Sequence, residues 1–157
     1  NVTIITDNDL HIQKGWNLKA LPIDKEINAN IFKAKILWKY TNGKWEAYSN
    51  DKNTQQTIKK LEKEGVLKTF NTIKPAEGFW IYANEADVKV FDGKGYGIEK
   101  INLHNGWNLV GIGEDISTNQ LKDKNIQYIW KYTNGKWMAY SSNSSMMKKI
   151  EDAGIEK

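Results

Sequence analysis

Residues 38–49 read WKYTNGKWEAYS, and residues 130–141 read WKYTNGKWMAYS. Eleven of the twelve positions are identical, and the two stretches begin 92 positions apart. Agreement of this length does not arise by chance, so either a functional motif is present twice or one structural unit is repeated. We interpret the stretch mainly as part of a repeated structural unit.

The dipeptide Asn42-Gly43 lies between two alternating runs and predicts a β-hairpin. A two-residue type I′ turn needs a positive φ at both central positions, which Asn and Gly tolerate best. Directly opposed residues share a face, so this turn predicts one face made of Trp38, Tyr40, Trp45 and Ala47. The opposite face is predicted to contain Lys39, Thr41, Lys44 and Glu46. We expect the aromatic face to be the core face and the lysine face to be exposed to water.

The similarity between the two halves of the chain extends beyond the hairpin. GWNL at 15–18 recurs at 106–109, and KKLE at 59–62 recurs as KKIE at 148–151. The first half also contains EGFW at 77–80, which has no counterpart in the second half. The sequence therefore indicates one full unit and most of another.

These repeats predict two tandem units, residues 1–93 and residues 94–157, of which the second is incomplete at its C-terminal side. Residues 2–5 (VTII) resemble residues 88–91 (VKVF), so the first unit is preceded by a strand similar to the end of an earlier unit. The incomplete second unit should have an open sheet edge, and open edges favour pairing with other strands. We predict strand exchange or self-association there, with residues 2–5 as one covering strand.

The remaining patterns predict short elements. The alternation at 16–21 (WNLKAL) and the apolar run at 78–83 (GFWIYA) indicate strands, and 87–91 should form a closing strand. Residues 57–64 (TIKKLEKE) suit a short amphipathic helix that ends at Gly65. The predicted fold class is mainly β (α+β), with two small antiparallel-sheet units that each carry one short helix.

GWNL, WKY-NGKW and P-x-EGFW together form a recognisable pattern. The set resembles repeat modules of large secreted and surface-attached bacterial and archaeal proteins, in which GWNL(I/V) precedes a W-x-Y-x-NGKW hairpin and then PGEGFWV. The resemblance covers nearly the whole chain, although the second half lacks the EGFW part and Ala76 stands where the pattern often has Gly. It implies an extracellular, non-enzymatic module, secreted or at the cell surface, and identifies no ligand.

The composition narrows the function further. All 23 basic residues are lysines, and the formal net charge is +4. The absence of arginine disfavours specific nucleic-acid binding, because the guanidinium fork is the usual group that contacts bases and phosphates. The chain has no cysteine, which rules out disulfides and thiolate metal sites. No apolar run approaches the ~20 residues that span a bilayer, so we expect no membrane insertion.

Residues suited to catalysis are few. His11 and His104 have no partner at metal-ligand spacing, and Glu77, before a tryptophan-containing strand, is the best single candidate for a general acid. We therefore expect no enzymatic activity and no cofactor. Asp7-Asn8-Asp9 and Asp51-Lys52-Asn53 have the oxygen-rich alternation of calcium loops but lack the later Gly and Glu. Ordinary turn chemistry is the prediction there, with calcium as the alternative.

Candidate ligand-binding residues lie in the aromatic strand at 78–83. Trp80 and Tyr82 should point to one face of this strand, and Phe79 and Ile81 to the other. Because both faces are apolar, the first pair either packs in the core or between units, or forms an exposed platform for sugar rings.

A second candidate patch lies on the lysine face of the two hairpins. Tyr48 lies beside Lys39, and Tyr140 beside Lys131. A tyrosine next to a lysine suits an acidic polysaccharide or a partner protein, whereas the plainer interpretation is a solvated sheet face.

Four functions follow as hypotheses. We favour a binding or adhesion module for glycan or protein at a cell surface. The alternative is a purely structural spacer of a stalk or surface array. Polyanion or nucleic-acid binding, suggested by the lysine excess, is less favoured. A glycosidase is the least favoured, because it would need two carboxylates ~5–10 Å apart in one cleft.

Overall fold

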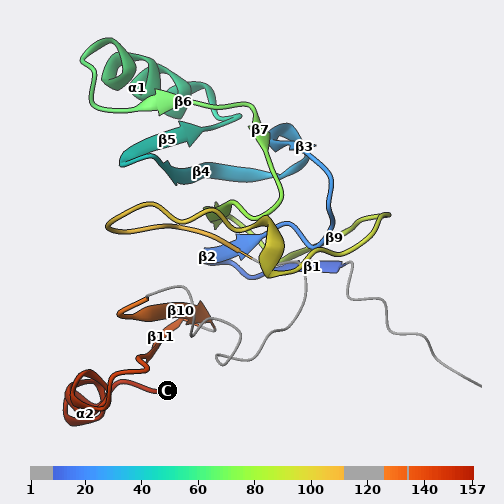
Figure 1. Ribbon diagram of the computed structural model, residues 1–157. Helices are drawn as coiled ribbons and strands as arrows, with labels where there is room; N and C mark the ends of the chain where they lie inside the picture. The colour runs from blue at the N-terminus through green and yellow to red at the C-terminus, as the bar shows by residue number, and fades with distance from the viewer. Residues whose placement is uncertain (1–8, 112–125, 134) are drawn as a thin grey trace, which may run out of the picture. The chain divides into compact units, whose positions relative to one another are not determined.

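A computed structural model of the chain describes residues 9–111, 126–133 and 135–157 (Figure 1). These residues form a mainly β protein with two helices and several small antiparallel sheets. The chain divides into two compact units, residues 1–115 and residues 116–157, called here the first and second units. The predicted repeat boundary at 93/94 stays a prediction, and the predicted strand at 2–5 lies outside the described residues. None of the helices described is both long enough and apolar enough to cross a membrane.

A five-stranded sheet forms the centre of the first unit. Its strands, in spatial order, are β2 (Gly15–Ala20), β8 (Gly78–Ala83), β4 (Ala34–Thr41), β5 (Lys44–Tyr48) and β6 (Lys68–Thr69). Neighbours are antiparallel except β5 and β6, which are parallel. Two-stranded antiparallel sheets pair β1 (Asp9–Ile12) with β9 (Asp87–Val90), and β3 (Ile27–Asn28) with β7 (Thr72–Ile73). Short 3-10 helices span Ala29–Ile31 and Ile98–Lys100.

The predicted hairpin is confirmed to the residue. Asn42 has a φ of 52° and Gly43 a φ of 78°, the backbone conformation that a tight turn between twisted strands requires. Tyr40 lies opposite Trp45 and Lys39 opposite Glu46. The predicted strand at 78–83 is also confirmed, and β8 lies between β2 and β4.

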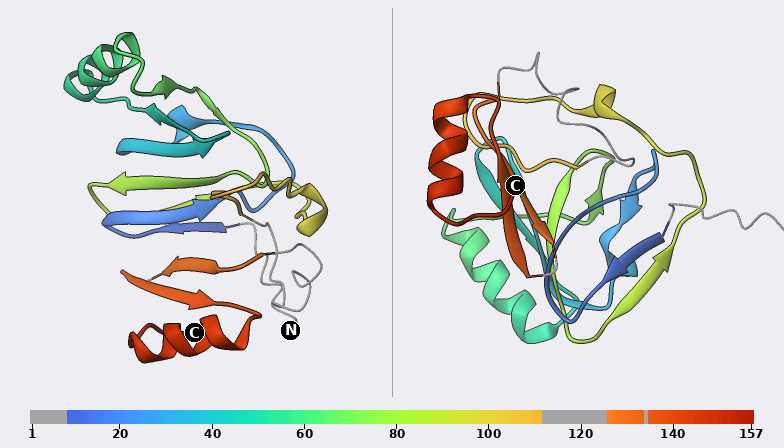
Figure 2. Two further views of the ribbon diagram at one scale, coloured as in Figure 1. Left: turned by 60° about the vertical axis from the view of Figure 1, so that its left-hand side comes forward. Right: turned by 90° about the horizontal axis from the view of Figure 1, so that it is seen from below.

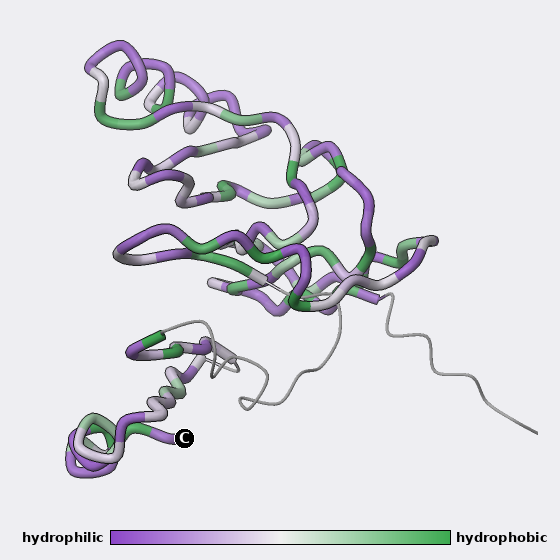
Figure 3. Tube along the Cα trace, in the orientation of Figure 1, coloured by the Kyte–Doolittle hydropathy of each residue, from purple (hydrophilic) through white to green (hydrophobic). Residues whose placement is uncertain are grey.

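The helix α1 (Lys52–Lys63) begins earlier than the predicted 57–64, because the Asp51 side chain caps its N-terminus by accepting from the Thr54 N–H. Figure 2 shows α1 at the β5–β6 end of the sheet. Its one buried side chain, Ile58, packs with Ala47 and Leu67, while the rest of the helix is largely hydrophilic (Figure 3).

The main hydrophobic core lies on the sheet face that carries Leu37, Phe79 and Ile81, all at most 1% exposed. Lys39 belongs to this face and is only 6% exposed. The prediction that the lysine face of this hairpin is exposed is therefore wrong at Lys39, whereas Lys44, beside the turn, is exposed as predicted. The opposite, aromatic face is a core face only where α1 covers it, at Ala47 and part of Trp38. Sequence reasoning failed here because it considered the hairpin alone, without the strands that pack beside it.

The second unit contains a hairpin and a helix. The hairpin joins β10 (Ile129–Thr133) to β11 (Lys136–Tyr140), and α2 (Ser144–Asp152) follows. Within the described part of this unit the buried side chains are Ala139, Ser141 and Ile150. This core is much smaller than that of the first unit.

Candidate functional site

Six aromatic side chains lie on one face of the central sheet, and we call this surface the aromatic face. It consists of Trp16 on β2, Trp80 and Tyr82 on β8, Trp38 and Tyr40 on β4, and Trp45 on β5. The strand registers bring them together, because Trp16 lies opposite Tyr82, Trp80 opposite Trp38, and Tyr40 opposite Trp45. The face thus crosses four adjacent strands.

The rings of the aromatic face hold one another in place. Trp16 meets Tyr82 edge-on with ring centroids 5.1 Å apart, and meets Trp80 at 6.3 Å. Trp38 and Trp45 are perpendicular at 6.1 Å, and Tyr40 lies 5.1 Å from Trp45. Aromatic contacts of this kind stabilise each pair by about 0.5–1.5 kcal/mol beyond the buried area. The six rings therefore form two sets of contacting side chains, one around Trp16 and one around Trp45.

Part of this array is open to water. Trp16 is 46% exposed and Trp45 is 43% exposed, and the other four rings are half-buried. Isolated exposed apolar residues are common, but contiguous apolar patches on a protein surface mark interaction sites. The aromatic face is the strongest candidate for a binding surface in the described residues.

The GWNL motif positions Trp16 at the start of β2. The Asn17 side chain folds back, accepting from the Gln13 N–H at 2.9 Å and donating to the Gln13 carbonyl at 2.8 Å. Asn17 is buried, while its neighbour Trp16 points to the aromatic face. Asn17 of the motif therefore stabilises the turn, and Trp16 contributes its ring to the aromatic face.

The same turn forms at the second GWNL. Asn108 accepts from the His104 N–H at 2.9 Å and donates to the His104 carbonyl at 2.8 Å. Here Trp107 is 71% exposed, because no strand pairs beside it in the described residues as β8 does beside Trp16. Both GWNL segments of this chain therefore form the same local turn.

A later segment of the first unit closes one end of the aromatic face. The Gly78 N–H donates to the Leu109 carbonyl at 3.3 Å, and the Gly111 N–H donates to the Ala76 carbonyl at 2.9 Å. Any side chain at Gly111 would come within 1.9 Å of the Ala20 Cβ. Glycine is needed here so that the two backbones can approach.

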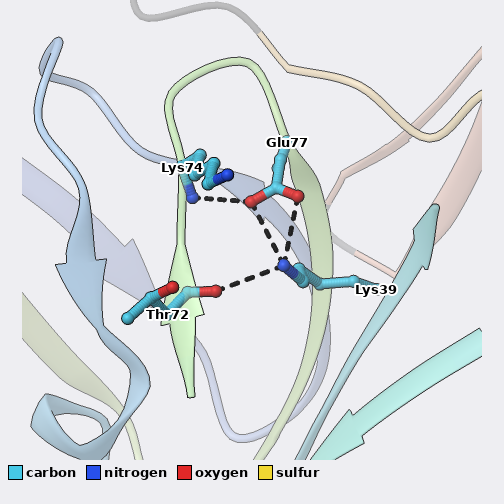
Figure 4. Close-up of polar contacts among 4 residues, drawn as sticks. All are labelled: Lys39, Thr72, Lys74 and Glu77. Carbon is cyan, nitrogen blue, oxygen red and sulfur yellow. Dashed lines mark hydrogen bonds and ion pairs between the residues drawn. The ribbon is translucent and has the colours of Figure 1, made fainter. Parts of the chain in front are cut away.

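The structure places Lys39, a predicted ligand-binding residue, inside the protein. Its Nζ donates to both carboxylate oxygens of Glu77, at 3.2 and 3.1 Å, and to the Thr72 carbonyl at 3.2 Å (Figure 4). It also lies 4.6 Å from the centroid of the Phe70 ring. Glu77 in addition accepts from the Lys74 N–H at 2.6 Å. These contacts stabilise the fold and occupy Glu77, the sequence-based candidate for a general acid.

Tyr48 also belongs to the core side of the sheet. Its ring lies 6.0 Å from that of Phe70, and its hydroxyl donates to the Asn50 side chain. Burial raises the pKa of the Tyr48 hydroxyl. Tyr48 and Lys39 therefore do not form the exposed patch that the sequence predicted.

The equivalent residues of the second unit are in a different environment. Lys131 is exposed and Tyr140 is half-buried, on the same face of the second hairpin. On the other face, Trp130 and Trp137 are perpendicular at 6.1 Å, as Trp38 and Trp45 are in the first unit. The aromatic contact thus recurs in both hairpins.

Of the predicted ligand-binding residues, Trp80 and Tyr82 alone belong to the aromatic face. Sequence reasoning assigned Trp38, Tyr40 and Trp45 to the core and did not consider Trp16. The alternation within GFWIYA could have indicated this surface. A strand with two apolar faces can lie beside the hairpin so that Trp80 and Trp38 are on the same face of the sheet. The order of the strands was needed to make that choice.

The residues considered for metal binding do not form a metal site in the described part of the chain. Across 9–111, 126–133 and 135–157, no cluster of three or more His, Asp or Glu side chains could hold a metal ion. Asp51, one of the residues considered for calcium, caps α1, and Asp9 begins β1. Asp7 lies outside the described residues.

Comparisons of the chain with protein-family models, with curated proteins and with solved structures give no match.

Proposed function

We propose that the chain is a non-enzymatic extracellular repeat module, secreted or at a cell surface, that binds glycan through the aromatic face. The observation that carries this proposal is the array of six aromatic rings across four strands, with Trp16 and Trp45 nearly half exposed. The resemblance of GWNL, WKY-NGKW and P-x-EGFW to modules of secreted and surface-attached proteins supports the same location.

The shape of the aromatic face suits a sugar polymer. Indole and phenol rings give large, rigid, apolar contact areas at low cost in conformational entropy. The C–H faces of pyranose rings are apolar and flat, so they can lie on such rings while the sugar hydroxyls stay in water. An open sheet face can take successive sugar units of a chain, whereas small molecules are usually bound in enclosed pockets.

Binding to insoluble polysaccharides tests the proposal. Chitin, cellulose, β-1,3-glucan and peptidoglycan are each incubated with the chain, and a glycan array covers soluble structures. We expect retention on at least one of these, reduced at least tenfold by Trp16→Ala or Trp45→Ala. Trp107→Ala is the matched control, because Trp107 is exposed but lies outside the aromatic face. Absence of binding throughout, or an equal loss in the control, would refute glycan binding at this surface.

A structural spacer in a stalk or surface array is the second candidate, favoured by the recurrence of the same internal contacts in both hairpins. In this interpretation residues 94–157 are an incomplete second copy of a tandem unit. A chain carrying additional copies should then give a maximum dimension in small-angle scattering that grows in proportion to copy number. A constant dimension would argue against the spacer.

A further inference from the structure

The hairpin and helix of the second unit repeat the contacts of the first at the level of individual atoms. Ser49 Oγ donates to the Lys35 carbonyl, and Ser141 Oγ donates to the Gln127 carbonyl. The two helices are capped in the same way, by Asp51 and by Asn143. The segment β10–β11–α2 therefore has the internal structure of β4–β5–α1.

The two hairpins differ in what lies beside them. In the first unit, β4 pairs with β5 on one edge and with β8 on the other. In the second unit, β10 pairs with β11, and the described residues provide no strand on its other edge. An unpaired strand edge presents a row of backbone N–H and C=O groups that can accept another strand.

The side chains beside that edge show the same difference. Leu37 is fully buried and Lys39 is held by Glu77, which immediately precedes β8. Their equivalents are Ile129, which is only half-buried, and Lys131, which is exposed and has no ion pair among the described residues. The second hairpin therefore has the cation and the apolar position of the first hairpin, but among residues 9–111, 126–133 and 135–157 no strand covers them.

We propose that β10 is an acceptor site for an added strand whose sequence is of the Glu-Gly-Phe-Trp-Ile-Tyr type. The strand adds antiparallel in the register that β8 uses on β4, in which Phe79 lies opposite Lys39 and Trp80 opposite Trp38. The bound strand then places its Trp opposite Trp130 and its Glu carboxylate on Lys131 Nζ. This mode of recognition takes affinity from main-chain hydrogen bonds and specificity from alternate side chains.

The positive charge of Lys131 favours an added strand that carries an acidic residue. An apolar strand without an acidic residue would cover Lys131 without neutralising it, and a buried unpaired cation is strongly unfavourable. Phe79 is the first residue of β8 that pairs with β4, so a strand with a Glu two residues before its first paired position repeats the arrangement of Glu77 and Lys39. The proposal does not depend on glycan binding, because it concerns the backbone edge of β10 in the second unit, whereas the aromatic face consists of side chains of the first unit.

A synthetic peptide with the sequence of residues 74–84, KPAEGFWIYAN, is the probe. It is titrated into the isotope-labelled full chain, and backbone amide shifts are followed by NMR. We expect saturable shifts in Ile129–Thr133 and none in Ala34–Thr41, because β8 already occupies the edge of β4. Shifts confined to β4 or to the aromatic face, binding of a scrambled peptide with equal affinity, or no shifts at millimolar peptide would each overturn the proposal.

A charge reversal tests the predicted ion pair. The variant Lys131→Glu should bind the peptide at least tenfold more weakly, since a hydrogen bond between charged groups contributes that much or more. A peptide carrying Glu77→Lys should recover the lost affinity on this variant and bind the unchanged chain poorly. Unchanged affinity in Lys131→Glu would overturn the proposal. Concentration-dependent shifts in β10 without peptide would show a second copy of the chain as the occupant instead, which also overturns it.

Discussion

Lys39 and Lys131 occupy the same position of the repeated sequence and lie in different environments. Lys39 is buried against Glu77, Thr72 and Phe70, whereas Lys131 is exposed. The contrast shows that the role of a residue in this motif depends on the strand beside it. The same substitution can therefore be made at Lys39 and at Lys131, and the two effects can be compared within one chain.

The first prediction uses this pair. Lys39→Ala removes one partner of a buried ion pair and leaves the Glu77 carboxylate uncompensated, so it should lower the free energy of unfolding of the first unit. Because Glu77 keeps some contact with water, with a side chain 23% exposed, we expect about 2–3 kcal/mol. Lys131→Ala should change the stability of the second unit by less than about 0.5 kcal/mol. Hydrogen exchange in β4 and β10 measures the two effects, and equal effects would contradict the assignment.

The second prediction concerns pH. Hydrogen bonds from the Thr54 hydroxyl and backbone N–H lower the pKa of the Asp51 carboxyl below its unfolded value. A group with a lowered folded pKa stabilises the fold above the unfolded value, near 3.8, and this contribution is lost as the pH falls through the folded pKa. Asp51→Asn should therefore reduce the acid sensitivity of α1.

The reciprocal change is Asn143→Asp at the cap of α2, which should introduce acid sensitivity where the natural Asn gives none. Hydrogen exchange in the two helices between pH 5 and about 2.5 tests both variants. Unchanged acid sensitivity of α1 in Asp51→Asn would contradict the role given to this carboxyl.

At the level of elements, the hairpin is the best-determined part of the fold. Its turn, its register and its aromatic pairs all follow from local sequence, and the two copies form the same ring geometry. The helices likewise follow their caps, at Asp51 and at Asn143. Interactions between residues close in sequence determine these elements, because the turn and the caps satisfy the backbone groups of each element locally.

The third prediction tests the turn. Gly43 has a φ of 78°, and a Cβ built there meets no atom within 4 Å, so Gly43→Ala introduces backbone strain alone. We expect a loss of about 1–2 kcal/mol in the stability of the first unit, measured by denaturant unfolding. Gly43→Asn should restore much of this loss, because Asn tolerates the left-handed region. Equal stability of the Ala and Gly forms would exclude the observed turn.

Across the whole molecule, the two units differ in the size of their cores. Fourteen buried residues form the main cluster of the first unit, whereas the described part of the second unit buries Ala139, Ser141 and Ile150. Stability follows the apolar area removed from water, so the second unit should unfold first. This ordering agrees with the open edge proposed for β10.

The fourth prediction concerns the independence of the units. Phe79 is fully buried in the first core, so Phe79→Ala should destabilise the first unit by about 3–5 kcal/mol. Hydrogen exchange in residues 126–157 should stay unchanged, because none of the main-cluster residues belongs to that segment. Trp107→Ala, at an exposed position, is the control and should leave both units unchanged. Matching losses in the two segments would show that the chain unfolds as one cooperative body.

The sequence by itself determined the hairpin, the strand at 78–83, a helix that ends before Gly65 and the division of Trp80 and Tyr82 from Phe79 and Ile81, whereas the start of the helix at the Asp51 cap was missed. These features depend on turn chemistry, caps and alternation, which act over a few residues. The tertiary structure decided which face of the hairpin is buried. Strand β8 pairs with β4 and brings Phe79 and Ile81 over Leu37, so the core forms on the lysine side and the aromatic rings stay partly in water. A two-faced apolar strand is compatible with either arrangement until its neighbours are in place, because burial is a property of the assembled sheet.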